Sequence, residues 1–143
     1  MRIWIDLANS PHVPFFRPLA NEFMRRGHEV VVTARQFAET VPLAEAAGFA
    51  PEVIGGHGGA KLAGKAGNLV GRGLELARWA RGKKMDLAVS HNSYSQILAA
   101  RARGPAPHWP QPWLLESGPL LSFVPLTNPQ PVKISRAPVA ATG

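Results

Sequence analysis

The chain opens with the stretch RIWIDLANSPHVPFFRPLANEFMRRGHEVVVTA, residues 2–34, in which two apolar strand patterns flank one helical pattern. The first apolar run covers residues 2–7 and is followed by a turn-forming triplet at 9–11. Apolar side chains then recur every three to four positions across 15–26, which is typical of a helix that buries one stripe. The run VVVTA at 30–34, rich in β-branched residues, is typical of a strand covered on both faces. The stretch therefore predicts a β-α-β unit.

The same alternation of strand and helix continues further along the chain. Helices are predicted at 36–47, at 61–83 and from the turn at 90–93 to 103, and strands at 51–54 and 86–89. Four glycines between positions 64 and 73 each disfavour the second of these helices by about 1 kcal/mol relative to alanine, so it is prone to interruption. Strands that alternate with helices through short connections form a parallel sheet with right-handed crossovers. We therefore predict an α/β fold, a Rossmann-like parallel sheet with helices on both faces.

The composition changes after the last predicted helix. Residues 104–143 hold nine of the fourteen prolines and a single acidic residue, Glu116. Because proline lacks a backbone N–H and disrupts both helices and central strands, this segment is predicted to be irregular. We predict one domain at 1–103 and a proline-rich tail at 104–143, which a truncated or frame-disrupted reading of a longer gene would explain.

The bulk composition restricts the functional classes open to the chain. The sequence of 143 residues contains no cysteine, which excludes disulfides, thiolate metal ligands and cysteine nucleophiles. It contains neither a secretion-signal pattern nor an apolar run long enough to cross a bilayer. We therefore expect a cytoplasmic protein that is at most peripheral to a membrane.

The formal net charge is +7, with basic residues concentrated between positions 61 and 103. Such a charge suits nucleic acid, anionic lipid or a phosphorylated ligand, and it also suits a solvated helix face. One interpretation is a basic α/β binding module that docks on an anionic membrane surface through Lys61, Lys65, Arg72, Arg78, Arg81, Lys83 and Lys84. Trp79 is the one aromatic residue between Lys61 and Lys84, which disfavours nucleic acid as a partner.

In an open parallel sheet, ligands bind beyond the carboxyl ends of the strands. Three of the five histidines fall on these strand-end loops. Small polar residues and glycines accompany them there. The candidate substrate-binding residues are Asn9, Ser10, His57, Gly58, Gly59, Ser90, His91, Asn92 and Ser93.

The candidate catalytic residue is His12. Imidazole titrates near neutral pH, so a histidine in the first strand-end loop could act as a general base toward a sugar hydroxyl, or could only pack within that loop. The turn at 90–93 precedes a helix, whose N-terminus suits a phosphate or a sugar hydroxyl, although Ser90 or Asn92 could serve only as the helix cap. Asp6, inside the first strand, is assigned a structural role. Without a carboxylate pattern beside the histidines, we predict no metal site.

Several motifs resemble the domain-of-unknown-function family 354. The runs DLANSPHVPFF at 6–16 and RGHEV at 26–30 resemble the start of that family. The segments HGG at 57–59 and DLAVSH at 86–91 resemble its later landmarks. The resemblance covers residues 1–103.

This family is similar to the GT-B glycosyltransferases and to the nonhydrolysing UDP-N-acetylglucosamine 2-epimerases. The peptidoglycan N-acetylglucosaminyltransferase also has a histidine in its first strand-end loop, about fifteen residues before a glycine, and His12 and Gly27 keep that separation. The resemblance implies the N-terminal, acceptor-side domain of a GT-B-type fold. The implied ligands are a nucleotide sugar and a glycan or lipid-linked acceptor, with no cofactor.

A chain of 143 residues has room for one of the two domains of such a protein, so we expect it to be inactive alone. Two alternatives stay open at this point. One is a fragment similar to the 2-epimerases, and the other is the basic binding module.

Overall fold

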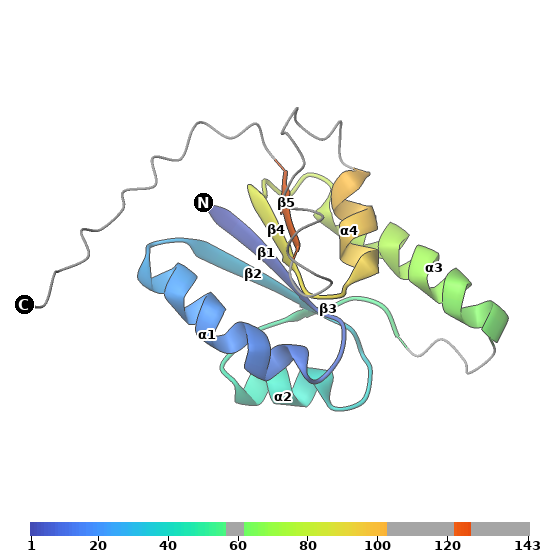
Figure 1. Ribbon diagram of the computed structural model, residues 1–143, viewed down its shortest axis with the longest axis horizontal. Helices are drawn as coiled ribbons and strands as arrows, with labels where there is room; N and C mark the ends of the chain where they lie inside the picture. Colours follow the sequence, from blue (N-terminus) through green and yellow to red (C-terminus); the bar gives the residue numbers. More distant parts are fainter. Residues whose placement is uncertain (57–61, 103–121, 127–143) are drawn as a thin grey trace, which may run out of the picture.

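Figure 1 shows the computed structural model of the chain, which describes residues 1–56, 62–102 and 122–126. A central sheet lies between helices (Figure 1). The elements follow in the order β1 (Arg2–Leu7), α1 (His12–Arg25), β2 (Glu29–Ala34), α2 (Thr40–Ala46), β3 (Glu52–Val53), α3 (Leu62–Ala80), β4 (Leu87–Ser90), α4 (Tyr94–Arg101) and β5 (Ser122–Pro125).

The sheet has the strand order β3-β2-β1-β4-β5. β1 pairs in parallel with β2 along its whole length and with β4 over residues 3–5. β2 and β3 are also parallel. Four parallel strands joined through helices confirm the predicted α/β, Rossmann-like fold. β2 and β3 lie on one side of β1, and β4 lies on its other side, so the strand order reverses at β1.

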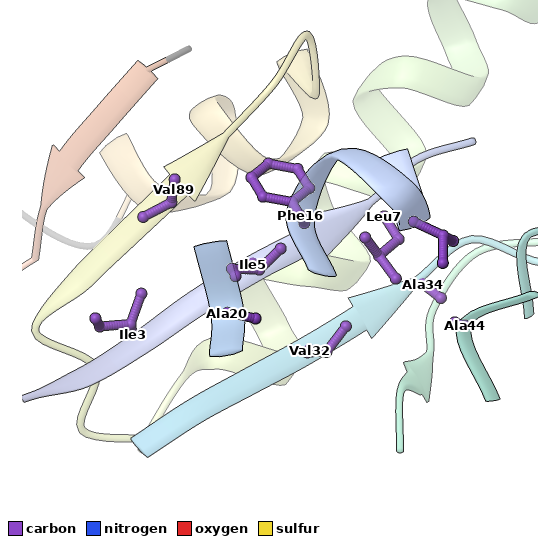
Figure 2. Close-up of a cluster of buried hydrophobic side chains, with 10 residues drawn as sticks. Ile3, Ile5, Leu7, Phe16, Ala20, Val32, Ala34, Ala44 and Val89 are labelled. Atoms are coloured by element: carbon purple, nitrogen blue, oxygen red, sulfur yellow. The ribbon is translucent and has the colours of Figure 1, made fainter. Parts of the chain in front are cut away.

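The first hydrophobic layer lies between the sheet and helices α1 and α2. Ile5 and Leu7 of β1 contribute to it together with Phe16 and Ala20 of α1, as Figure 2 shows. Ala44 brings α2 into the same cluster. All five side chains are fully buried. This layer explains the helical stripe of the sequence, because the apolar face of α1 covers the sheet.

The second layer lies on the opposite face of β1. Trp4 is fully buried there with Leu76 and Ala80 of α3 and with Ala99 of α4. β1 therefore has buried side chains on both faces, as expected for a central strand of a parallel sheet.

Helix α3 is continuous from Leu62 to Ala80, so the interruption favoured by its glycines does not occur. A Cβ atom added at Gly73 would lie 3.5 Å from the backbone oxygen of Ser95 and 3.6 Å from Cβ of Leu98. These are ordinary van der Waals distances, so α3 and α4 pack against each other at this position. Tertiary packing thus offsets the weak helix propensity of the glycines.

The N-terminal boundaries of two helices differ from the predicted ones. α1 begins at His12 rather than at residue 15, because Pro14 stands in the first turn, where its nitrogen has no helical bond to lose. α2 begins at Thr40 rather than at residue 36. Ala38 has a φ of +47°, which lies outside the helical region and interrupts the pattern.

The described part of the tail forms a strand that the sequence did not predict. Residues 122–125 form β5, which pairs antiparallel with β4 at the edge of the sheet. An edge strand tolerates Pro125 because one side of its backbone needs no ladder partner. Apart from Leu126, the other residues of the predicted tail lie outside the described ones, so the domain boundary at 103 stays a prediction.

Candidate functional site

The carboxyl ends of β1 and β4 meet where the strand order reverses. These strands are neighbours, but they lead to helices on opposite faces of the sheet, α1 and α4. The segments that leave them, residues 8–11 and 91–93, therefore lead to helices on opposite faces of the sheet. Open α/β sheets bind ligands in crevices at such topological switch points. We call residues 8–16 and 90–93 the switch-point site.

His12 is the first residue of α1 and is 3% exposed, so it is not a surface-loop residue. Its Nδ1 accepts a hydrogen bond of 3.1 Å from the backbone N–H of Ala8, and its own backbone N–H donates to the carbonyl of Asn9. Burial lowers the pKa of His12 below 6.5 and His91 lowers it further, whereas Asp6 acts in the opposite direction. The bonds close the turn between β1 and α1, and the environment favours the neutral ring.

An aromatic cluster accompanies His12. The ring of His91 stacks on Phe15 with centroids 4.4 Å apart, and it meets His12 edge-on at 5.1 Å. Phe16 contacts His12 from the hydrophobic layer at 6.1 Å. Phe15 is 42% exposed, so the cluster reaches the surface. Nδ1 of His91 is buried and has no hydrogen-bond partner among the described residues.

A second group, which we call the Asp6 network, consists of Asp6, Thr33, Arg72 and Ser93. Oδ1 of Asp6 accepts bonds from Thr33 Oγ1 at 2.6 Å and Arg72 Nη2 at 2.7 Å. Oδ2 accepts bonds from Arg72 Nη1 at 2.8 Å and Ser93 Oγ at 2.5 Å. Nε of Arg72 donates to the carbonyl of Ile54 at 3.1 Å. The network joins β1, β2, α3, the end of β3 and the start of α4.

Four donors occupy the carboxylate of Asp6, which agrees with a structural role for that residue. Arg72 was predicted to face a membrane, and this prediction is wrong, because its side chain is 6% exposed and paired with Asp6. Gly55 packs against it with a φ of +83°, and an added Cβ would lie 2.9 Å from Cδ of Arg72. The sequence carried no signal for this pair, since Arg72 resembles the other basic residues of a solvated helix.

The switch-point site contains the predicted binding residues that fall in the described part of the chain. Asn9 and Asn92 are exposed and Ser10 is half-buried. Ser90 and Ser93 are buried, and Oγ of Ser90 accepts the backbone N–H of Ser93 at 3.2 Å. Ser93, rather than Ser90 or Asn92, is the N-cap residue of α4, and its side chain makes no cap bond. The hydroxyl of Ser90 therefore shapes the turn and that of Ser93 belongs to the Asp6 network, while the side chains of Asn9 and Asn92 are exposed.

The predicted glycine-rich part of the site, His57, Gly58 and Gly59, lies outside the described residues. At the opposite edge of the sheet, a surface pocket of about 310 Å³ is lined by residues that include Arg2, Phe49 and Glu52. None of the predicted site residues lines that pocket.

The basic helix offers fewer free cations than its sequence suggests. Besides the paired Arg72, Nζ of Lys83 lies 2.7 Å from a carboxylate oxygen of Glu52 and 4.1 Å from the ring centre of Trp79. Arg78, Arg81 and Lys84 are exposed. Across residues 1–56, 62–102 and 122–126, no helix combines the length and the apolar character needed to cross a membrane.

Comparisons with known proteins agree with the resemblance. The model of the family described as "Protein of unknown function (DUF354)" matches residues 1–99. The uncharacterized protein MJ0665 of Methanocaldococcus jannaschii is 39% identical over 56 residues, a segment that covers 39% of this chain and 16% of that protein. No solved structure matches the chain. The family description and the name of the relative assign no activity.

Proposed function

This chain belongs to the DUF354 family of proteins of unknown function, and from that premise we propose that it is the acceptor-side half of a GT-B-like protein that uses nucleotide sugars. In this proposal the complete protein transfers a glycosyl unit from a nucleotide sugar to a glycan or a lipid-linked acceptor. The switch-point site is the wall that this domain contributes to the cleft between two domains.

The observation that carries the proposal is the edge-on contact of His12 and His91 where the strand order reverses. Ligand sites typically combine aromatic surface with a few placed polar groups. Here the exposed ring of Phe15 offers the aromatic surface. The exposed amides of Asn9 and Asn92 offer hydrogen bonds to sugar hydroxyls. His12 is the residue proposed to act on the substrate.

The helices that begin at the switch-point site favour negative charge. Neither α1 nor α4 has an acidic residue in its first turn or a side-chain cap. Their positive dipole ends therefore suit the phosphates of a nucleotide sugar or of a lipid-linked acceptor.

One wall of a cleft orients a ligand but supplies only part of the contacts. We therefore expect this chain alone to bind nucleotide sugars weakly and to show no transferase or epimerase activity. The epimerase-like alternative uses the same class of ligand at the same site. A binding experiment therefore tests nucleotide-sugar binding at the switch-point site, which both interpretations require.

The test is a titration of the ¹⁵N-labelled chain with UDP-N-acetylglucosamine, followed by amide chemical shifts. We expect shifts at residues 8–13 and 91–94, with a Kd in the millimolar range, and none around the pocket at the opposite edge. Binding in the low micromolar range would contradict the half-site, and the absence of shifts at both segments at several millimolar ligand would contradict the proposal.

A matched pair of charge variants locates the binding. Asn92→Asp places a carboxylate at the start of α4, where it repels phosphate, and it should weaken binding several-fold. Asn21→Asp makes the same change at an exposed position in the middle of α1 and should leave the Kd unchanged. Equal effects of the two variants would show a general charge effect rather than a site.

A further inference from the structure

The outer edge of β2 is covered by β3 only near its carboxyl end. β3 pairs with β2 at Thr33 and Ala34. Among the described residues, no strand pairs with β2 on this side over residues 29–32. An unpaired strand edge presents backbone groups that can pair with another chain. This part of β2 is therefore a candidate for the addition of a strand.

The parallel ladder determines which backbone groups face the open edge. Alternate residues of a central strand bond to opposite neighbours. The N–H of Glu29 donates to the carbonyl of Met1, on the side of β1, whereas the carbonyl of Ala34 accepts a bond from the residue that follows β3. The N–H and C=O of Val30 and the N–H of Val32 therefore face the open edge, on the same side as the carbonyl of Ala34.

The surface pocket of about 310 Å³ lies directly beside these groups. Val30, Val31 and Val32 of β2 line it, and Met24 of α1 and Phe49 add to its apolar walls. Ligand sites in proteins occupy roughly 300–1,000 Å³, so this pocket has room for a short segment. An open strand edge and an apolar pocket thus occur at the same place.

The charged residues of the pocket are already paired. Nε of Arg2 lies 2.9 Å from a carboxylate oxygen of Glu29, and a carboxylate oxygen of Glu52 lies 2.7 Å from Nζ of Lys83. Within the described residues, the lining therefore has no unpaired charge that would attract an ionic ligand. It suits an uncharged partner with apolar side chains, whose backbone amides can bond to the open edge.

The segment that leads into β3 favours a single extended chain as the occupant. Gly48, Phe49 and Ala50 line the pocket together with β2. A second copy of the protein would carry the same segment at the same edge, so pairing of two copies through β2 would bring these two segments together. One extended peptide meets no such obstacle.

We propose that the open edge of β2 binds an extended, uncharged peptide segment of a partner protein, which adds to the sheet beside Val30 and Val32 and places an apolar side chain in the surface pocket. In strand addition, main-chain hydrogen bonds supply affinity and pockets for alternate side chains supply specificity. A strand rises by about 3.3 Å per residue, so the edge over residues 29–32 holds about four residues of peptide. The switch-point site takes no part, and the interaction is independent of the proposed function.

The first test needs no ligand. Amide hydrogen exchange should be faster at Val30 and Val32, whose N–H groups face the open edge, than at Val31 and Thr33, whose N–H groups bond to β1. Equal protection of the four amides would show that the edge is already covered and would overturn the proposal. A dimer by sedimentation analysis in which Val30 and Val32 are protected would assign the edge to a second copy, and it would overturn the assignment to a peptide.

The second test uses a short acetylated and amidated peptide of alternating threonine and valine as the probe. Its titration should shift the amide signals of Val30 and Val32 and slow their exchange. The same peptide N-methylated at two consecutive residues lacks a donor on each of its edges but keeps the apolar side chains, so it should bind about tenfold more weakly or less. No binding of the first peptide at millimolar concentration, or equal affinity of the two peptides, would overturn the proposal.

A matched pair of variants locates the bound peptide. Met24 and Leu43 are exposed helical residues, at 50% and 40%, and of the two Met24 lines the pocket. Met24→Glu places a charge on the apolar wall and should weaken binding of the peptide about tenfold, whereas Leu43→Glu should leave it unchanged. Equal affinities of the two variants for the peptide would overturn the location of the site.

Discussion

The polar residues around the switch point fall into two sets. Asp6, Arg72 and Ser93 are buried and satisfy one another, whereas Nδ1 of His91 is buried without a partner among the described residues. A buried polar group without a partner costs about 1–3 kcal/mol, so the first set stabilises the fold and His91 does not.

The buried ring of His12 should make stability depend on pH. Burial and His91 lower its pKa from 6.5, although the Asp6 carboxylate and carbonyl oppose the shift and Arg72 adds to it. Below pH 6.5 the unfolded chain therefore binds more protons than the folded chain, which favours unfolding. The stability that the neutral His12 ring contributes to the folded chain is fully present above pH 6.5. It is lost as the pH falls through the pKa of His12 in the folded state.

Urea denaturation across this range measures the effect. His12→Asn removes the titrating group, so the stability difference between the unmodified chain and this variant should shrink as the pH falls below 6.5. A difference that stays constant would show that the fold does not hold His12 neutral.

Loss of the Arg72 side chain should be among the most destabilising single changes. Arg72→Ala leaves the fully buried carboxylate of Asp6 without its ion pair, and breaking a buried pair in this way costs about 3–5 kcal/mol. Denaturant unfolding gives the value. The control is Arg26→Ala, which breaks an ion pair of 2.6 Å between side chains that are 64% and 36% exposed and should cost far less. Equal losses would contradict the importance of the Asp6 network.

Helix α3 shows how an element can depend on its neighbour more than on its own sequence. Its glycines are poor helix formers, yet the helix is continuous because one face packs on the sheet and on α4. The contacts around Gly73 are at ordinary van der Waals distances, so a methyl group fits there.

Gly73→Ala should therefore raise the stability of the chain. Alanine improves helix propensity by about 1 kcal/mol, and a Cβ at this position would approach no other atom closer than 3.5 Å. Thermal unfolding measures the change. Gly48→Ala is the contrasting variant, since a φ of +86° strains any residue with a Cβ and should lower the melting temperature. A destabilised Gly73→Ala protein would mean that α3 and α4 need a closer approach than the structure shows.

At the scale of the whole molecule, β5 is the edge strand of the sheet and covers the outer side of β4. The backbone N–H of Leu126 donates to the carbonyl of Asp86 at 2.9 Å, and the register pairs Val124 with Ala88. In an antiparallel ladder alternate residues share the same bonding role, so Val124 belongs to the hydrogen-bonded set. Without β5, the backbone of β4 would be an open edge.

Val124→Pro should detach β5, because it removes a donor from the ladder. Hydrogen exchange should then become faster at the amide of Ala88, while the amides of β2 keep their protection. Phe123→Pro serves as the control, since the N–H at that alternate position faces away from β4. Unchanged protection of Ala88 in Val124→Pro would show that β5 does not protect this edge.

The parallel sheet and the location of the candidate site could be predicted from sequence because both follow from local patterns. Hydrophobic periodicity marks each strand and helix, and the ends of parallel strands share one edge. The ion pair between Asp6 and Arg72 could not be predicted, since the two residues are 66 positions apart and the arginine lies in a basic helix. The burial of His12 and the strand at Ser122–Pro125 likewise depend on neighbours that are distant in the sequence.

The Asp6 network also has a consequence for the time course of folding. Its bonds join residues that are 66 and 87 positions apart, so they can form only after both β-α crossovers have closed around β1. Contacts of this kind are absent from an early transition state and act on the rate of unfolding rather than on the rate of folding. The buried pair is thus expected to determine the lifetime of the folded state. Arg72→Ala should unfold faster, while it refolds at nearly the original rate.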